Sequence, residues 1–282
     1  MSRVVRAGRE LGAVLDAARA GGAVVGFVPT MGALHAGHRA LIARARAETG
    51  LVVVSIFVNP LQFGVGEDLD AYPRDLAADL AVCEAEGVDV VFAPPLAEMW
   101  PRPPVVRVAA GPFGEVLEGA HRPGHMDGVA TVVAKLLHQA GRCHAYFGRK
   151  DAQQLALVRR MVADLAFDAE VVACDIVREP DGLALSSRNA YLDATERAAA
   201  PALHRALAAG RDAWRADPAL TPARIEAVAR RVLAAEPAFA VDYVSLVDPD
   251  AFQPAGGTAE GQLLAAAARL GRTRLIDNVV LS

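Results

Sequence analysis

The stretch that decides the fold is Phe27-Val-Pro-Thr-Met-Gly-Ala-Leu-His-Ala-Gly-His38. The apolar run 23–28, with which this stretch overlaps, is typical of a buried strand. After the stretch, a helix is predicted over 38–49. Gly32 and Gly37 allow the backbone to approach a ligand closely. Because the start of a helix presents free N–H groups and positive potential, this strand–turn–helix unit predicts a phosphate-binding site.

Around this unit, apolar strands alternate with helices. The predicted strands are 23–28, 51–58, 88–92, 143–147 and 171–177, and the predicted helices are 38–49, 73–87, 129–137 and 151–164. Strands that are apolar along their length and separated by helices indicate a parallel sheet covered on both faces. The fold class predicted for this part of the chain is therefore α/β.

The pattern changes after residue 177. A polar loop is expected at 178–189, followed by Ala-rich helices at 195–215 and 221–235 and by strands at 241–247, 263–270 and 273–276. We therefore predict a first domain over 1–177 and a smaller α+β domain over 178–282.

Composition excludes several classes of protein. The 282 residues carry 29 Lys and Arg against 33 Asp and Glu, a net charge of −4, so no bulk attraction to nucleic acid or anionic lipid is expected. No apolar run reaches the roughly 18 residues of a membrane span, and no signal-peptide pattern is seen. Three widely spaced cysteines indicate a reducing compartment. We expect a cytoplasmic protein that binds neither nucleic acid nor membrane.

Three further segments carry polar residues near the ends of predicted strands. Lys150 could reach a phosphate, and Gln154, one turn on, could bind a hydroxyl or carboxylate. The amides of Asn59 and Gln62 suit a small polar substrate. Two hydroxyls and an arginine in 185–189 could close over a triphosphate. Each segment alone is also typical of a solvated helix start, a turn cap or an ordinary loop.

The histidines allow more than one interpretation. His35 and His38 are three residues apart, which places them near one face of a helix, either as phosphate ligands or as two surface histidines beside a helix cap. A helical zinc motif would need an i, i+4 pair with an intervening Glu, which is absent. His121 and His125 have that spacing, but a Pro-Gly pair between them argues against a helix. Segment 118–126 is therefore predicted to be an irregular functional loop.

Ordered motifs over nearly the whole chain resemble the pantothenate synthetase (pantoate–β-alanine ligase) family. They are Pro-Thr-Met-Gly-Ala-Leu-His-x-Gly-His at 29–38, Phe-Val-Asn-Pro-x-Gln-Phe at 57–63, Tyr-Pro-Arg at 72–74, Arg-Pro-Gly-His at 122–125, Lys-Asp-x-Gln-Gln at 150–154, Ser-Ser-Arg-Asn at 186–189 and Asp-Tyr-Val at 242–244. The His-x-Gly-His element is also similar to the signature of nucleotidyltransferases that direct attack on the α-phosphate of ATP.

This resemblance implies a fold, a reaction and partners. The first domain would be Rossmann-like, the second a C-terminal lid, and the protein a homodimer that uses ATP and Mg²⁺. Pantoate carboxylate would attack the α-phosphorus of ATP to give pantoyl adenylate and pyrophosphate. β-Alanine would then attack the acyl carbon to give pantothenate and AMP.

The resemblance also implies which residues bind each substrate. ATP would contact Met31, Gly32, Ala33, Leu34, His35, Ala36, Gly37, His38, Gly148, Arg149, Lys150, Asp151, Val177, Leu185, Ser186, Ser187 and Arg188. Pantoate would contact Gln62 and Gln154, and β-alanine would border Gln62. The catalytic residues would be His38, His35, Lys150 and Arg188, with His38 as proton donor. The ligands of the metal stay open.

Three residues depart from the family pattern. Met126 and Leu185 keep apolar bulk where the family has Phe and Met, whereas Arg149 replaces a Glu and reverses a charge beside Lys150. Two alternatives also remain open. One is another adenylyl-transferring enzyme that makes a dinucleotide, although the two glutamines suit such an acceptor poorly. The other is a non-catalytic nucleotide-sensing module, against which the intact cationic and imidazole side chains argue.

Overall fold

The computed structural model describes residues 2–256 and 259–282. The chain forms two compact units, Met1–Arg149 with Leu157–Asp175, and Lys150–Ala156 with Ile176–Ser282. The short segment that carries Lys150 therefore groups with the C-terminal part of the chain. The expected domain division after residue 177 stays a prediction.

The first unit contains a six-stranded sheet. In spatial order its strands are β1 (Arg3–Val5), β4 (Val90–Phe92), β3 (Leu51–Ile56), β2 (Val25–Thr30), β5 (Cys143–Gly148) and β6 (Ala169–Cys174). Every neighbouring pair is parallel, which confirms the predicted α/β class. Thr30 pairs with Ile56, so β2 and β3 end level and the segments that follow them start at the same edge of the sheet.

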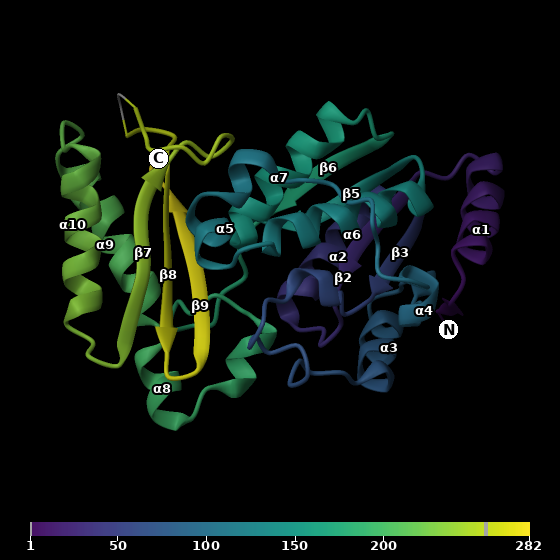
Figure 1. Cartoon of the computed structure of the whole chain (residues 1–282), viewed down its shortest axis with the longest axis horizontal. Coiled ribbons are helices and arrows are strands. Elements are labelled where there is room, and N and C mark those ends of the chain that lie inside the picture. The colour runs from purple at the N-terminus through teal and green to yellow at the C-terminus, as the bar shows by residue number, and fades with distance from the viewer. Residues whose placement is uncertain (1, 257–258) are drawn as a thin grey trace. The chain divides into compact units, whose positions relative to one another are not determined.

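Helices, which Figure 1 labels, and short 3-10 helices connect these strands. They are α1 (Gly8–Ala20), α2 (Ala36–Glu48), η1 (Pro60–Gln62), α3 (Leu76–Ala85), α4 (Leu96–Met99), η2 (Gly111–Gly114), α5 (Leu117–His121), α6 (His125–Ala140), η3 (Arg149–Asp151) and α7 (Ala152–Asp164). One core joins Ile42 of α2 and Cys83 of α3 to Val28, Val54 and Val91 of the strands. Alternate strand residues point to opposite faces. Helix α6 packs against β2, β5 and α1.

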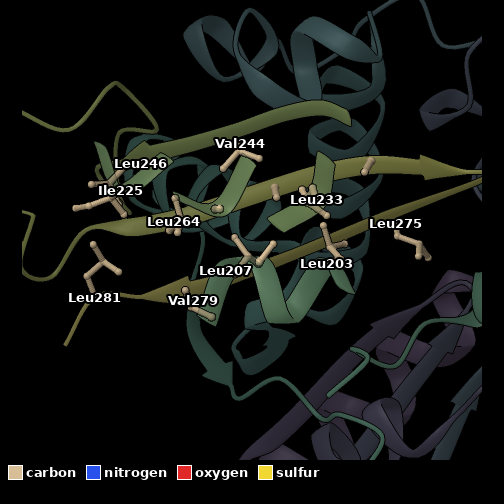
Figure 2. Packing of buried hydrophobic residues seen from close by; sticks show 14 of the residues in the cluster. Leu203, Leu207, Ile225, Leu233, Val244, Leu246, Leu264, Leu275, Val279 and Leu281 are labelled. Atoms are coloured by element: carbon tan, nitrogen blue, oxygen red, sulfur yellow. The ribbon is translucent and has the colours of Figure 1, made fainter. Parts of the chain in front are cut away.

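The second unit has an antiparallel sheet in the order β7 (Phe239–Val247), β8 (Leu263–Leu270) and β9 (Thr273–Val280). Its other elements are η4 (Ser187–Tyr191), α8 (Ala194–Ala199), α9 (Ala202–Ala216) and α10 (Pro222–Ala234). Figure 2 shows Leu207 of α9 and Ile225 of α10 in one buried cluster with Val244, Leu264 and Val279 of the strands. This helix-on-sheet layer is the predicted α+β arrangement.

Several predicted elements were wrong in extent. The helix expected over 195–215 is two helices, α8 and α9, which Pro201 separates because proline lacks the N–H that a continuous helix needs. The helix expected from Pro73 begins at Leu76, where the Asp75 side chain accepts from Ala78 N at 3.0 Å. The segment 118–126, expected to be irregular, contains the end of α5 and the start of α6.

Among the described residues, no helix is both long and apolar enough to cross a membrane. Cys83, Cys143 and Cys174 are buried free thiols. Burial raises the pKa of Cys83 and of Cys143 to about 12, so both stay protonated and unreactive at neutral pH.

Candidate active site

The loop between β2 and α2 is held from two sides. Thr30 Oγ1 donates to Ser55 O at 2.7 Å and accepts from Gly32 N at 3.1 Å. On the other side, the Asp79 carboxylate accepts from Ala33 N at 3.1 Å and Leu34 N at 2.8 Å. The backbone of the predicted anion-binding loop is therefore fixed before any ligand enters.

Asp79 is a site residue that the sequence motifs missed. It lies on α3, is 3% exposed, and crowds the loop so closely that a Cβ on Gly32 would lie 2.7 Å from its Oδ2. Gly32 also has a φ of +81°, which favours glycine. Burial raises the pKa of the Asp79 carboxyl, and the two loop N–H groups oppose that shift. An acidic residue that follows a predicted helix start gives no sequence signal of this long-range role.

The two signature histidines are arranged as a cap. His35 precedes α2, and its Nδ1 accepts from Gly37 N at 3.1 Å. His38, in the first turn, accepts from His35 N through its own Nδ1 at 3.3 Å, and the ring centroids are 4.1 Å apart. Because each Nδ1 is an acceptor, the proton of each neutral ring is on Nε2. Two adjacent Nε2–H donors thus stand at a helix start whose first turn has no acidic residue.

Gln62 lies beside this loop in a buried amide network. Its Oε1 accepts from Asn59 Nδ2 at 3.1 Å, and its Nε2 contacts Met31 Sδ at 3.2 Å. Asn59, 1% exposed, is itself held by Trp100 Nε1, which donates to its Oδ1 at 3.2 Å, and by Gly128 O. These contacts fix the orientation of the Gln62 amide. The contact with Met31 also joins the segment of Asn59 and Gln62 to the loop between β2 and α2.

The Arg122 and His125 side chains hold the backbone of the same glutamine. His125 Nδ1 donates to Gln62 O at 2.7 Å, and its Nε2 accepts from Arg122 Nη1 at 2.9 Å. Arg122 also binds Glu67 through Nε and Nη2, at 2.7 and 2.6 Å. The segment that was expected to be an irregular functional loop is thus a support for Gln62, built from the junction of α5 and α6.

Charge and burial set the protonation states of this support. Burial, and then the neighbouring Arg122 charge, lower the pKa of His125 to about 4, so the ring is neutral at pH 7. Burial acts to raise the pKa of Glu67, but the hydrogen bonds and charge of Arg122 outweigh it and lower that pKa to about 2. A neutral His125 can donate to the Gln62 carbonyl and accept from Arg122 at once.

The remaining predicted residues lie mostly in the second unit. Lys150 Nζ is 3.9 Å from Asp151 Oδ2, and Lys150 O accepts from Asn278 Nδ2 at 3.0 Å. Gln154 follows one turn later on α7 and is partly exposed. Arg149, in the first unit, pairs with the exposed Asp175 at 3.2 Å, so its reversed charge has a carboxylate partner of its own.

The loop with two serines and an arginine is locally ordered. Leu185 N donates to Val177 O at 3.0 Å, which closes a short hairpin. Ser186 Oγ then accepts from Arg188 N at 3.3 Å and caps η4, which contains Ser187 and Arg188. The Ser186 hydroxyl therefore has a structural task in this structure, as an N-cap.

No group of three or more His, Cys, Asp or Glu that could hold a metal is found within 2–256 and 259–282. The predicted site residues thus form two sets. In the first unit, Gln62 contacts Met31, the first residue of the segment 31–38. In the second, Lys150 and the hairpin before Arg188 are tied to the same strand, β9, through Asn278 and Asp277.

The fold and the site residues together define a class of protein. It is a parallel α/β protein with polar side chains beyond the strand ends and a helix N-terminus suited to binding anions. The model of the pantoate-beta-alanine ligase family matches residues 3–280, so the chain belongs to this family. The ligase class and the fold expected from the motifs are confirmed, and neither alternative function is favoured.

Similar proteins support this membership. A protein described as pantothenate synthetase 4 of Frankia alni is 57% identical over 98% of this chain and 88% of that protein. The pantothenate synthetase of Koribacter versatilis is 51% identical over 99% and 96%. The crystal structure of pantothenate synthetase from Thermus thermophilus has a TM-score of 0.93 at 48% identity, covering 99% of each chain.

A further solved structure names ligands. It is the pantoate-beta-alanine ligase of Francisella tularensis, complexed with "Beta-gamma ATP" and beta-alanine. It has a TM-score of 0.81 at 30% identity and covers 100% of this chain and 98% of that one.

Proposed function

We propose that this chain condenses pantoate with β-alanine in two steps at the expense of ATP. A pantoate carboxylate oxygen attacks the α-phosphorus of ATP, the bond from phosphorus to the bridging oxygen breaks, and pyrophosphate leaves. The amine of β-alanine then attacks the acyl carbon of pantoyl adenylate, the acyl C–O bond breaks, and AMP leaves as the amide nitrogen loses a proton. Family membership carries this proposal, and the ligands of the Francisella tularensis relative support it.

The first unit supplies neutral donors for the phosphates. The Nε2–H groups of His35 and His38 and the start of α2 meet charge that develops on the phosphate oxygens in the transition state, without having to change protonation. His38, which the family resemblance assigns as the proton donor, fills that role by a hydrogen bond from its Nε2–H to the departing pyrophosphate, and the proton stays on the ring. The fixed backbone of 31–34 brings the ATP close to this helix start.

The second unit supplies cations. Lys150 and Arg188 neutralise phosphate charge, and Ser187 and the backbone around Leu185 and Ser186 complete the ATP site. Gly148, Arg149, Asp151 and Val177 border the same ligand. The lid role of the C-terminal part, which would shield the acyl adenylate from water, belongs to this proposal.

The two glutamines select the acid substrate. Gln62 Oε1 is engaged by Asn59, and one amide N–H faces Met31 Sδ, so the other N–H is the group that we assign to a pantoate oxygen. Gln154 binds pantoate from the start of α7. Gln62 also borders β-alanine, which places the amine acceptor beside the acyl group.

We also propose that Mg²⁺ is used, and that it enters with ATP. No cluster of three or more acidic, His or Cys ligands lies in the described part of the chain. Such an ion would be held mainly by phosphate oxygens and water, and the Asp151 carboxylate lies 3.9 Å from Lys150 Nζ. When bound, Mg²⁺ would offset charge on the triphosphate. A homodimer and a cytoplasmic location complete the proposal, on the strength of the family resemblance.

A pyrophosphate-release assay tests the function. The proposal predicts release only when pantoate and ATP are both present, and pantothenate and AMP in equal amounts once β-alanine is added. Release with ATP and a nucleotide acceptor in place of pantoate would favour a dinucleotide product. ATP binding without release under any condition would favour a sensing module. Sedimentation of the same sample tests the homodimer.

A further inference from the structure

Asp277 and Asn278 are two buried polar residues that the proposed chemistry does not use. They are neighbours on β9 and are only 3% and 5% exposed. Asp277 accepts from Arg178 Nη1 at 2.6 Å and from Arg178 Nη2 at 2.9 Å, and His204 Nδ1 lies 3.5 Å away. Neighbouring residues of a strand point to opposite faces of the sheet, so the two side chains act in different directions.

The Asp277 side of the pair holds the hairpin that precedes Arg188. Arg178 donates through Nη1 to Gly182 O at 3.0 Å, and it forms a bridge with Ala184 across the hairpin. Asn189 Nδ2 donates to Ala184 O at 3.1 Å on the far side of the loop. The Arg178–Asp277 ion pair therefore ties the hairpin at Gly182 to β9, and the bond from Asn189 to Ala184 O joins the other side of 185–188 to the same hairpin.

The Asn278 side holds the backbone of Lys150. Asn278 Nδ2 donates to Lys150 O at 3.0 Å, a contact between residues 128 positions apart. It is not part of any strand pairing, and it fixes the main chain where η3 leads into α7. A long lysine side chain starts from this fixed point.

We propose that the Asp277–Asn278 pair is a positioning element. It holds the backbone of Lys150 and that of the Arg188 loop to one strand, so that both cationic side chains can reach the phosphates. This inference rests on the proposed function, in which both cations meet ATP. Lys and Arg side chains are long and flexible, so their aim depends on where their backbones are held. A displacement of about 1 Å at such groups can cost about 10²-fold in rate.

The first test is a double-mutant cycle in single-turnover pyrophosphate release, which stays measurable in slow variants. Asn278→Ala should lower kcat/KM for ATP about tenfold in the native background and by less than about twofold in Lys150→Ala, because the residue acts through Lys150. Equal fold-losses in both backgrounds would overturn this half of the proposal.

The second test applies the same cycle to Asp277→Asn with Arg188→Ala, against a matched control. Asp242 forms an ion pair from β7, at the other edge of this sheet: its carboxylate accepts from Arg274 Nε at 2.6 Å, and the Asp242 and Arg274 side chains are 15% and 12% exposed. The fold-loss in kcat/KM caused by Asp242→Asn should multiply with the fold-loss caused by Arg188→Ala. The fold-loss caused by Asp277→Asn should be smaller in the Arg188→Ala background than in the native one. If the fold-losses of both aspartate variants multiply with that of Arg188→Ala, Asp277 stabilises the fold and does not position the loop.

The cycles separate failure of the inference from failure of the proposed function. Native-like release by Lys150→Ala and Arg188→Ala alone would overturn their roles, and the positioning element with them. Large losses in those single variants with fully multiplicative cycles would overturn the positioning element alone. Thermal melting of each variant identifies any that fails to fold, in which case the other cycle decides.

Discussion

The two units hold their proposed phosphate-binding groups by different means. In the first, Thr30 Oγ1 and the Asp79 carboxylate accept from the backbone N–H groups of Gly32, Ala33 and Leu34, which fixes the loop that leads to the phosphate-binding helix start. In the second, a partly buried ion pair between Arg178 and Asp277 holds only the backbone from which the long Arg188 side chain extends. The first arrangement fixes the position of the loop backbone, whereas the second leaves the end of a long cationic side chain able to move with a bound phosphate. Variants in the first unit should therefore lose specific hydrogen bonds.

The largest effect in the first unit is expected at His38. His38→Ala removes a transition-state donor, and such losses commonly cost about 10²–10³ in rate. Pyrophosphate release from pantoate and ATP measures it. His138→Ala, an exposed histidine of α6, is the matched control and should release pyrophosphate at the native rate. A loss of only a few-fold in His38→Ala would remove the role assigned to this ring.

The glutamines should separate acid binding from nucleotide binding. Gln62→Ala and Gln154→Ala should each weaken pantoate binding by roughly 1.5–3 kcal/mol, the value of a hydrogen bond to a charged group. ATP binding should fall less. Gln139→Ala, on α6, is the control glutamine and should leave both affinities unchanged. Calorimetric titration decides, and an equal loss of ATP affinity would contradict the assignment.

Two aspartates at α3 offer a matched test of the loop. Asp79→Ala leaves the N–H groups of Ala33 and Leu34 without their acceptor, so ATP binding should weaken about tenfold and stability should fall by about 1–3 kcal/mol. Asp75→Ala removes a helix cap, which costs about 1 kcal/mol, but it should not change ATP affinity. Calorimetry with denaturant unfolding compares them, and equal ATP affinities would show that Asp79 does not hold the site.

A smaller effect is expected from pH at His125. Its pKa falls from 6.5 to about 4 on folding, so between these values the unfolded chain binds a proton that the folded chain does not. The contribution of His125 to the free energy of unfolding should therefore be complete above about pH 6.5 and be lost progressively as the pH falls toward 4. His125→Gln should flatten this decline in urea unfolding, whereas the exposed His138→Gln should not. An unchanged slope in His125→Gln would contradict the buried, neutral ring.

The sequence predicts the strands of the first unit well because they are apolar along their length. β2 and β3 were expected within two residues of their observed ends. Helix α1 was not predicted, since only Leu11 and Leu15 are buried along it and the apolar repeat is short. The Ala-rich composition on both sides of Pro201 predicts one helix over 195–215, whereas the chain forms two. Local composition thus identifies an element more reliably than it locates its ends.

The site shows the same limit more strongly. Motif spacing pointed to His35, His38 and Gln62; the two histidines contact each other, and Gln62 contacts Met31 of the same loop. It could not reveal Asp79, because a partner about 46 residues away leaves no local pattern. Only the folded chain shows which polar residues support the ones that a motif contains.

The central claim is that the carboxylate of pantoate becomes bonded to the α-phosphorus of ATP before the amide forms. Pantoate labelled with ¹⁸O in its carboxylate, incubated with ATP and then β-alanine, tests it directly by mass spectrometry of the products. The account predicts one ¹⁸O atom in AMP, because the carboxylate oxygen stays on phosphorus when the amide forms. Label in pyrophosphate or phosphate, or an acylated protein in the intact-mass spectrum, would contradict it.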